Sequence, residues 1–208
     1  SGSVEAIGSF KSMLGDLLKL NDFEFKDSQA ERRPFRRLKV RIKEEIVDSG
    51  NPDLRPIAAI NHHLPPTEWN KVLESGDDFI LLDTRNTYET AVGMFEGAVD
   101  PKIEKFNQFA TYVDQAQIPK DKKVLMYCTG GIRCEKAILQ MQERGYDNVF
   151  QLQGGILKYL EEFPNKHFKG ECFVFDHRVS VDQSLNPSAR YGLCPHCGDP
   201  GETRIECK

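Results

Sequence analysis

Apolar positions follow two periods along the chain, and the change between them divides the sequence into regions. In residues 4–20 apolar side chains recur at helical spacing. In residues 37–43 they alternate at the spacing of a strand, with Leu38, Val40 and Ile42 on one face and Arg37, Lys39, Arg41 and Lys43 on the other. A helix and one strand cannot form an independent domain, so we interpret residues 1–50 as the remnant of a larger α+β module.

The middle of the chain alternates between short apolar strands and helices. Residues 51–66 contain four prolines and no sustained period, which predicts a linker in which His62 and His63 are solvated. The strands are expected at 79–83, 123–127 and 149–152, and the helices at 67–74, 88–92, 103–116, 132–144 and 156–163. This alternation predicts an α/β domain over residues 67–165, a parallel sheet with helices on both faces. Residues 166–208 form a Cys-rich C-terminal segment, with one strand predicted at 172–175.

Composition narrows the class of protein. Apolar residues make up 39% and charged residues 29% of the 208 positions, which excludes a disordered chain. The longest apolar run, 124–128, is far shorter than the roughly 18 residues of a membrane span. Six cysteines, two of them in a C-x-x-C, favour reactive or metal-binding thiols in a reducing compartment. We therefore expect a soluble cytoplasmic protein with no membrane partner.

Positive charge is concentrated near the N-terminus. Residues 31–43 carry a net charge of +6, although the whole chain carries −4. The candidate nucleic-acid contacts are Arg36, Arg37, Lys39, Arg41 and Lys43. A solvated edge strand protected by charge has the same sequence pattern.

The segment after residue 123 carries the clearest chemistry. A buried strand over 123–127 delivers Cys128 to the carboxyl edge of the sheet, where open α/β sheets place their sites. The loop that follows consists of Thr129, Gly130, Gly131, Ile132 and Arg133. Its backbone N–H groups and the start of a helix stabilise an anion, so the pKa of Cys128 should fall. Arg133 adds positive charge and is expected to hold an anion. Only four residues separate Cys128 from Arg133, which suits a sulfur atom better than a phosphate.

Other residues are expected to support this loop. Asp83 and Arg85 follow the first strand of the domain and predict a buried ion pair, with direct substrate contact as the alternative. Glu89 can pair with either arginine. Cys134 has two open roles: it resolves an oxidised Cys128 by forming a disulfide, or it packs as a small apolar residue.

The C-terminal cysteines suggest a structural metal. Cys194 and Cys197 form a C-x-x-C and Cys207 follows ten residues later, a pattern that predicts a structural zinc ion with three cysteine ligands. Cys172 and His196 are both open as the fourth ligand. The sequence shows no flavin or nicotinamide fingerprint, and no cofactor is identified from it.

Several of these motifs together resemble known proteins. Asp83-Thr84-Arg85, Tyr88-Glu89, the Cys128 loop and Gly154-Gly155-Ile156 resemble the rhodanese domain over residues 65–165. CTGGIRCEKA, FRRLKVRIKEEIV and GECFVFDHRV with the later C-x-x-C resemble the rhodanese-like tRNA uridine hydroxylases over nearly the whole chain.

The second resemblance implies an activity that the residues alone do not. It implies oxygen-dependent hydroxylation of wobble uridine to 5-hydroxyuridine, with Cys128 in the active site, tRNA as partner and molecular oxygen as co-substrate. It also implies a ferredoxin- or acylphosphatase-like N-terminal module. Two chemical roles are open for Cys128: addition to uracil C6 as a thiolate, or participation as an oxidised or persulfide sulfur. The loop supports a rhodanese-type sulfurtransferase equally well, whereas the intact Cys128 and Arg133 disfavour a non-catalytic binding module.

Overall fold

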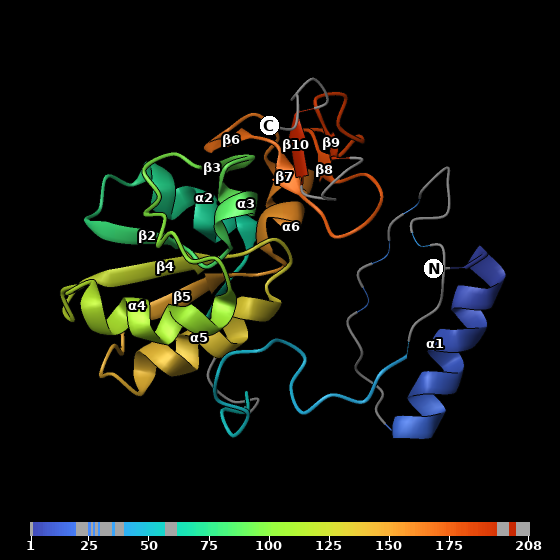
Figure 1. The fold of residues 1–208 in the computed structure, drawn as a ribbon, viewed down its shortest axis with the longest axis horizontal. Helices are drawn as coiled ribbons and strands as arrows, with labels where there is room; N and C mark the ends of the chain where they lie inside the picture. The colour runs from blue at the N-terminus through green and yellow to red at the C-terminus, as the bar shows by residue number, and fades with distance from the viewer. Residues whose placement is uncertain are drawn as a thin grey trace. The chain divides into compact units, whose positions relative to one another are not determined.

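The computed structural model describes residues 2–19, 40–56, 62–194 and 200–202, and the single residues 25, 27, 29 and 35. The chain divides into two compact units, residues 1–41 and 42–208. In the first unit, α1 (Val4–Leu18) confirms the expected N-terminal helix (Figure 1). The Ser3 side chain accepts a hydrogen bond from the Ala6 N–H at 3.2 Å and so begins the helix.

A four-stranded parallel sheet lies at the centre of the second unit. Its order is β1 (His63–Leu64), β5 (Val149–Leu152), β4 (Lys123–Tyr127) and β2 (Phe79–Asp83). All three pairings are parallel, which confirms the predicted sheet. The helices of this unit are α2 (Pro66–Glu74), α3 (Thr87–Thr90), the 3-10 helix η1 (Phe106–Gln108), α4 (Phe109–Gln115), α5 (Ile132–Gln142) and α6 (Gly155–Glu162).

Helices cover both faces of the sheet, as the continuous apolar strands require. Helices α4 and α5 lie on one face and α2 and α6 on the other (Figure 1). Alternate residues of β4 therefore enter different cores: Val124 and Met126 pack with α4 and α5, whereas Leu125 and Tyr127 pack with α2 and α6. Burial on both sides explains why β4 is an unbroken apolar run.

Short antiparallel strand pairs form the C-terminal segment, and the first of them attaches it to the sheet domain. They are β3 (Gly93–Phe95) with β6 (Phe168–Gly170), β7 (Cys172–Phe173) with β8 (Ser180–Val181), and β9 (Tyr191–Leu193) with β10 (Pro200–Glu202). In the β3–β6 pair the two backbones approach so closely at Gly93 that no side chain fits between them. A Cβ at Gly93 would lie 2.5 Å from the Lys169 carbonyl oxygen. Glycine at this position is therefore required for the segment to dock.

Two expectations for the sheet domain and the linker before it differ from the structure. The helix predicted over 103–116 is wrong at its start, because the Ile103 carbonyl accepts the Thr87 N–H at 2.9 Å and leaves the helical hydrogen-bond pattern. The prediction that His62 and His63 are solvated is also wrong. His63 lies in β1 and its Nε2 is 2.7 Å from Glu135 Oε1, while His62 Nδ1 is 2.7 Å from the Val149 carbonyl oxygen.

The expected basic strand is not formed in its described part. Residues 40–43 lie in no strand, and Val40 and Ile42 are fully or almost fully exposed. A strand needs a neighbour to satisfy its backbone groups, and no described residue pairs with this segment. The rest of the predicted strand, including Arg36, Arg37 and Lys39, lies outside the described residues.

The segment that follows packs onto α5 of the second unit. Lys136 Nζ lies 3.1 Å from Glu45 Oε2 and also donates to the Leu54 carbonyl. Gln140 Nε2 donates to the Ser49 carbonyl at 2.9 Å. These contacts hold residues 45–54 beside the sheet domain. Among the residues that the structure describes, no helix is long and apolar enough to cross a membrane.

Candidate active site

Cys128 lies between the end of β4 and the start of α5, where the sequence predicted it. Gly131, with φ of 96°, caps α5 and turns its N–H toward the sulfur, which accepts it at 3.1 Å. The backbone N–H groups of Arg133 and Cys134 also favour the charged form of this sulfur. The Cys128 side chain is 2% exposed, and the loop closes around it as a ring of donors.

This ring stabilises the thiolate form of Cys128. The thiol of Cys134 donates a hydrogen bond to Cys128, and this bond, the Arg133 charge and the backbone donors outweigh the effect of burial. Together they lower the pKa of Cys128 to about 6. Burial and the same hydrogen bond raise the pKa of Cys134 well above its usual value. The two neighbouring sulfurs are therefore a thiolate and a thiol at neutral pH, as is required for a nucleophile beside a proton donor.

Arg133 is held by Glu89 from α3. Its Nη1 lies 2.5 Å from Glu89 Oε2 and its Nη2 lies 2.7 Å from Glu89 Oε1, a two-pronged buried pair. Thr129 Oγ1 also donates to Glu89 Oε1 at 3.1 Å. Of the two arginines open to Glu89 by sequence, the structure thus pairs it with Arg133. The expected role of Arg133 in holding a substrate anion stays a prediction.

Asp83 and Arg85 form the predicted buried ion pair at the end of β2. Both side chains are fully buried, and Arg85 Nη2 lies 2.7 Å from Asp83 Oδ2 and 2.6 Å from the Gly93 carbonyl oxygen. The guanidinium also faces the rings of Tyr127 and Phe168, at 5.8 and 6.0 Å. This arrangement ties β2 to β3 behind the Cys128 loop, and burial of both side chains keeps them out of the pocket.

The first turn of α6 supports the loop from a second side. Ile156 N–H donates to the Cys128 carbonyl at 3.0 Å, and Leu157 N–H donates to the Thr129 carbonyl at 3.2 Å. Gly155 has φ of 65°, and a Cβ on it would lie 2.5 Å from the Cys128 carbonyl oxygen. The glycine turn therefore lets the helix approach the backbone of the reactive loop.

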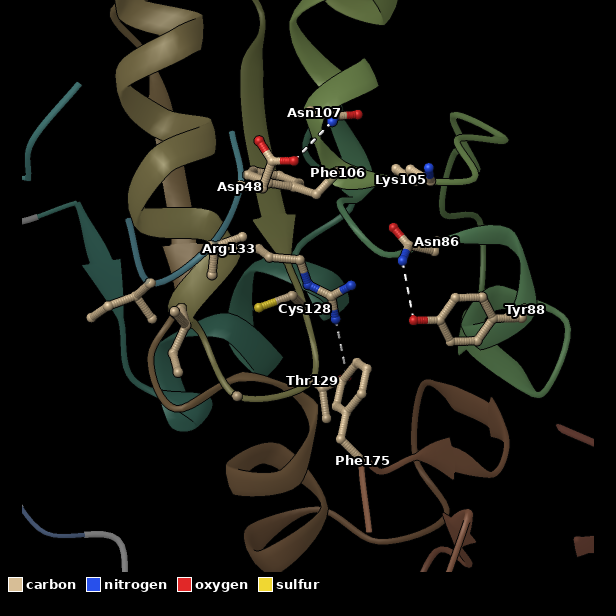
Figure 2. A pocket seen from close by; sticks show the side chains of 14 residues that line it. Asp48, Asn86, Tyr88, Lys105, Phe106, Asn107, Cys128, Thr129, Arg133 and Phe175 are labelled. Atoms are coloured by element: carbon tan, nitrogen blue, oxygen red, sulfur yellow. Dashed lines mark hydrogen bonds between the residues drawn. The ribbon is translucent and has the colours of Figure 1, made fainter. Parts of the chain in front are cut away.

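A pocket of about 580 Å³ opens above Cys128. Figure 2 shows Arg133 next to Cys128, with Phe175, Tyr88 and Phe106 among the surrounding side chains. Phe175 is 62% exposed and its ring centroid lies 5.8 Å from the Arg133 guanidinium carbon. The volume of the pocket is within the usual range for small-molecule sites.

Sequence reasoning missed most of the pocket walls. The members of the wall not singled out as site residues are Ile46, Val47, Asp48, Asn86, Tyr88, Lys105, Phe106, Asn107 and Phe175. Part of the pocket lining comes from segments that flank the sheet domain: Val47 precedes the domain and Phe175 follows it. Phe175 stands in the GECFVFDHRV motif, which was the one signal in the sequence that could have pointed to it.

The remaining candidate residues are not among those that line this pocket, or they lie outside the described residues. Arg41 and Lys43 are exposed, as a nucleic-acid contact requires. Cys194 is half-buried, but Cys197 and Cys207 lie outside the described residues, so the zinc site stays a prediction. Within the described ranges, no three His, Cys, Asp or Glu side chains gather as metal ligands.

Comparison with known proteins matches three parts of the chain. The model of the Rhodanese-like domain matches residues 66–162, the UPF0176 acylphosphatase like domain matches residues 1–46, and the Rhodanase C-terminal model matches residues 169–208. A tRNA uridine(34) hydroxylase of Picosynechococcus sp. is 42% identical over 203 residues, covering 96% of this chain and 67% of the relative. The chain belongs to the rhodanese-like tRNA uridine hydroxylase family.

A second curated relative agrees with this membership. A tRNA uridine(34) hydroxylase of Bdellovibrio bacteriovorus is 53% identical over all 208 residues of this chain. The chain spans 59% of the length of that relative. Among solved structures, the rhodanese-like domain of an Anabaena protein is 18% identical with a TM-score of 0.45, covering 62% of this chain and 87% of that one.

Proposed function

We propose that this protein hydroxylates C5 of uridine 34 in tRNA, using molecular oxygen and the thiolate of Cys128. The observation that carries the proposal is the Cys128 ring of donors beneath a pocket with aromatic walls, in a chain whose relatives are named tRNA uridine(34) hydroxylases. tRNA as the substrate agrees with the cytoplasmic location expected from the cysteine content.

The geometry suits nucleophilic activation of a pyrimidine. A uracil ring that enters the pocket meets the Cys128 sulfur at its base and the rings of Tyr88 and Phe175 at its walls. Addition of the thiolate to uracil C6 places negative charge on C5 and O4, and C5 then reacts as a carbon nucleophile towards oxygen. The lowered pKa of Cys128 keeps the attacking thiolate populated at neutral pH.

Phosphate contacts are proposed to come from the basic N-terminal segment. Arg41 and Lys43 are its described and exposed members, and each phosphate that such residues neutralise releases counterions. RNA affinity should therefore fall steeply as salt rises, and a flat salt response would remove this segment from the interface.

The test is mass spectrometry of tRNA nucleosides from cells that lack the gene. We expect 5-hydroxyuridine derivatives to disappear, to return with the wild-type gene, and to stay absent with Cys128→Ser. The Cys172→Ser variant is the matched control, because Cys172 is buried but lines no part of the pocket.

A sulfurtransferase is the second candidate, because the same loop also fits a persulfide on Cys128. In that case thiolated nucleosides would fall while the hydroxylated ones stayed unchanged. This outcome would overturn the hydroxylase proposal and keep Cys128 as the reactive residue.

A further inference from the structure

A second thiol contacts Cys128 from the first turn of α5. The Cys134 thiol donates a hydrogen bond to the Cys128 sulfur, and the Cys134 N–H donates to the Gly131 carbonyl at 3.1 Å. Thr84 Oγ1 lies 3.5 Å from the Cys134 sulfur, and both groups are buried. Both sulfurs belong to one buried core cluster, in which Cys128 is 2% and Cys134 is 0% exposed.

The proposed reaction needs two electrons that uridine and oxygen do not supply. When one atom of O₂ enters a C–H bond, the other atom leaves as water, and its reduction takes two electrons and two protons. Two thiols in contact release two electrons and two protons when they form a disulfide. The pair beneath the pocket therefore matches the missing half of the reaction in number and in position.

We propose that Cys128 and Cys134 act as a dithiol that supplies these two electrons, an inference that rests on the proposed function. Overall, one uridine C5–H, one O₂ and the two thiols give one C5–OH, one water and one Cys128–Cys134 disulfide. Cys134 is thereby a catalytic residue, because its sulfur attacks the reacting atom of Cys128.

The steps balance when oxygen first adds to C5. The C5 carbanion adds O₂, and the peroxide takes up a proton to give a C5 hydroperoxide. C5 then loses its hydrogen as a proton, the C5=C6 double bond forms again, and Cys128 leaves C6 as a thiolate. This thiolate attacks the outer oxygen, the O–O bond breaks, and the products are 5-hydroxyuridine and a Cys128 sulfenic acid. The Cys134 sulfur then attacks Cys128, the S–O bond breaks, and hydroxide leaves with the Cys134 proton as water. A dithiol reductant such as dithiothreitol restores both thiols by exchange.

The two cysteines are suited to different steps. Cys128 is the thiolate and so the nucleophile, whereas Cys134 keeps its proton until Cys128 is oxidised. Once Cys128 is a sulfenic acid, its negative charge no longer opposes ionisation of Cys134. The order of the two attacks follows from this difference.

The test counts disulfides against product in a limited reaction. Reduced protein, freed of reductant, is mixed with an anticodon stem–loop RNA in air, quenched with an alkylating reagent and digested with trypsin. Cleavage after Arg133 separates the two cysteines, so the disulfide joins peptide 124–133 to peptide 134–136. We expect one linked peptide pair for each 5-hydroxyuridine, no more than one product per chain, and further turnovers when dithiothreitol is added.

Matched variants separate this role from packing. Cys134→Ser keeps a hydrogen-bond donor beside Cys128, and we expect no linked peptide and a Cys128 sulfenic acid that dimedone traps. Cys172→Ser changes a buried thiol that bonds the Phe173 carbonyl, and it should leave one disulfide per product.

Two results would overturn the inference in different ways. Product formed by the wild type with both thiols still reduced would overturn the dithiol role and leave the proposed function standing. No product from the wild type, with reductant present and RNA bound, would overturn the proposed function and the dithiol role with it.

Discussion

Two buried arginine–carboxylate pairs flank the Cys128 loop, and they differ in what surrounds them. The Asp83–Arg85 pair is fully buried, spans two residues of one turn and also bonds the Gly93 carbonyl. The Glu89–Arg133 pair joins α3 to the loop, and Arg133 borders the pocket beside Cys128. The first pair has the protein interior on every side, whereas the second shares its charge with a reactive sulfur. Similar chemistry thus serves stability at one site and reactivity at the other.

Replacing Arg85 should have the largest effect, and it should be on stability. Arg85→Ala leaves the Asp83 carboxylate buried without its partner and should lower the free energy of unfolding by about 3–5 kcal/mol. Urea denaturation measures this change, with Arg85→Lys as the control that keeps the charge. The reference is the exposed ion pair between Asp114 and Arg144. A loss of stability smaller than that caused by Asp114→Asn would contradict the structural role of Arg85.

Removing the second pair should act on Cys128 instead. The double variant Glu89→Gln with Arg133→Gln removes both charges and keeps hydrogen-bonding groups of similar size. Loss of the Arg133 charge should raise the pKa of Cys128 from about 6, moving the midpoint up by about one pH unit. The thiolate is the reactive form above its pKa, so the rate of iodoacetamide alkylation against pH reports this midpoint.

Arg85→Lys should leave that midpoint in place, because Arg85 is not among the groups that lower the pKa of Cys128. Cys128→Ser gives the background rate from other thiols. An unchanged midpoint in the double variant would show that the two pairs do not differ in their effect on the sulfur.

Phe175→Ala should have a smaller effect, limited to substrate binding. It removes the ring beside Arg133 and one wall of the pocket, so the KM for an anticodon stem–loop RNA should rise about tenfold. The exposed side chain adds little to folding, so the unfolding midpoint should stay unchanged. Phe175→Tyr keeps the ring and should retain the KM; a fall in kcat alone would contradict a role in binding.

The exposed pair between Arg144 and Asp114 should show the smallest effect. The two side chains are 26% and 56% exposed, and water and salt screen their attraction. Asp114→Asn should leave the free energy of unfolding within measurement error of the wild type. A loss comparable to that of Arg85→Ala would mean that burial is not what separates these ion pairs.

The sheet could be predicted because its signals are local. Strands β2, β4 and β5 have the predicted bounds, since each is a mostly apolar run whose residues are buried or half-buried. β1 was missed because two residues carry no period, and it is defined by the bond from the Gln151 N–H to the His62 carbonyl at 2.8 Å. The predicted helix start at Ile103 was wrong for the same reason, because the backbone partner of Ile103, Thr87, is distant in the sequence.

The same distinction between local and distant signals separates the site residues that were predicted from those that were missed. Cys128, its glycines and Arg133 are contiguous in the sequence, and the Asp83–Arg85 pair is nearly so, which is why both were predicted. The partner of Glu89 lies 44 residues away, and Val47 and Phe175 reach the pocket from outside the sheet domain. Only the folded chain brings these groups together, and their spacing along the sequence does not indicate that they are close in space.

The measurement that tests the central claim most directly is the origin of the oxygen in the product. The purified, reduced protein would be incubated with an anticodon stem–loop RNA under oxygen-18 gas in ordinary water, and the nucleosides analysed by mass spectrometry. The account predicts 5-hydroxyuridine that carries one oxygen-18 atom with the wild type and no product with Cys128→Ser. Oxygen drawn from water, or sulfur in place of oxygen, would contradict it.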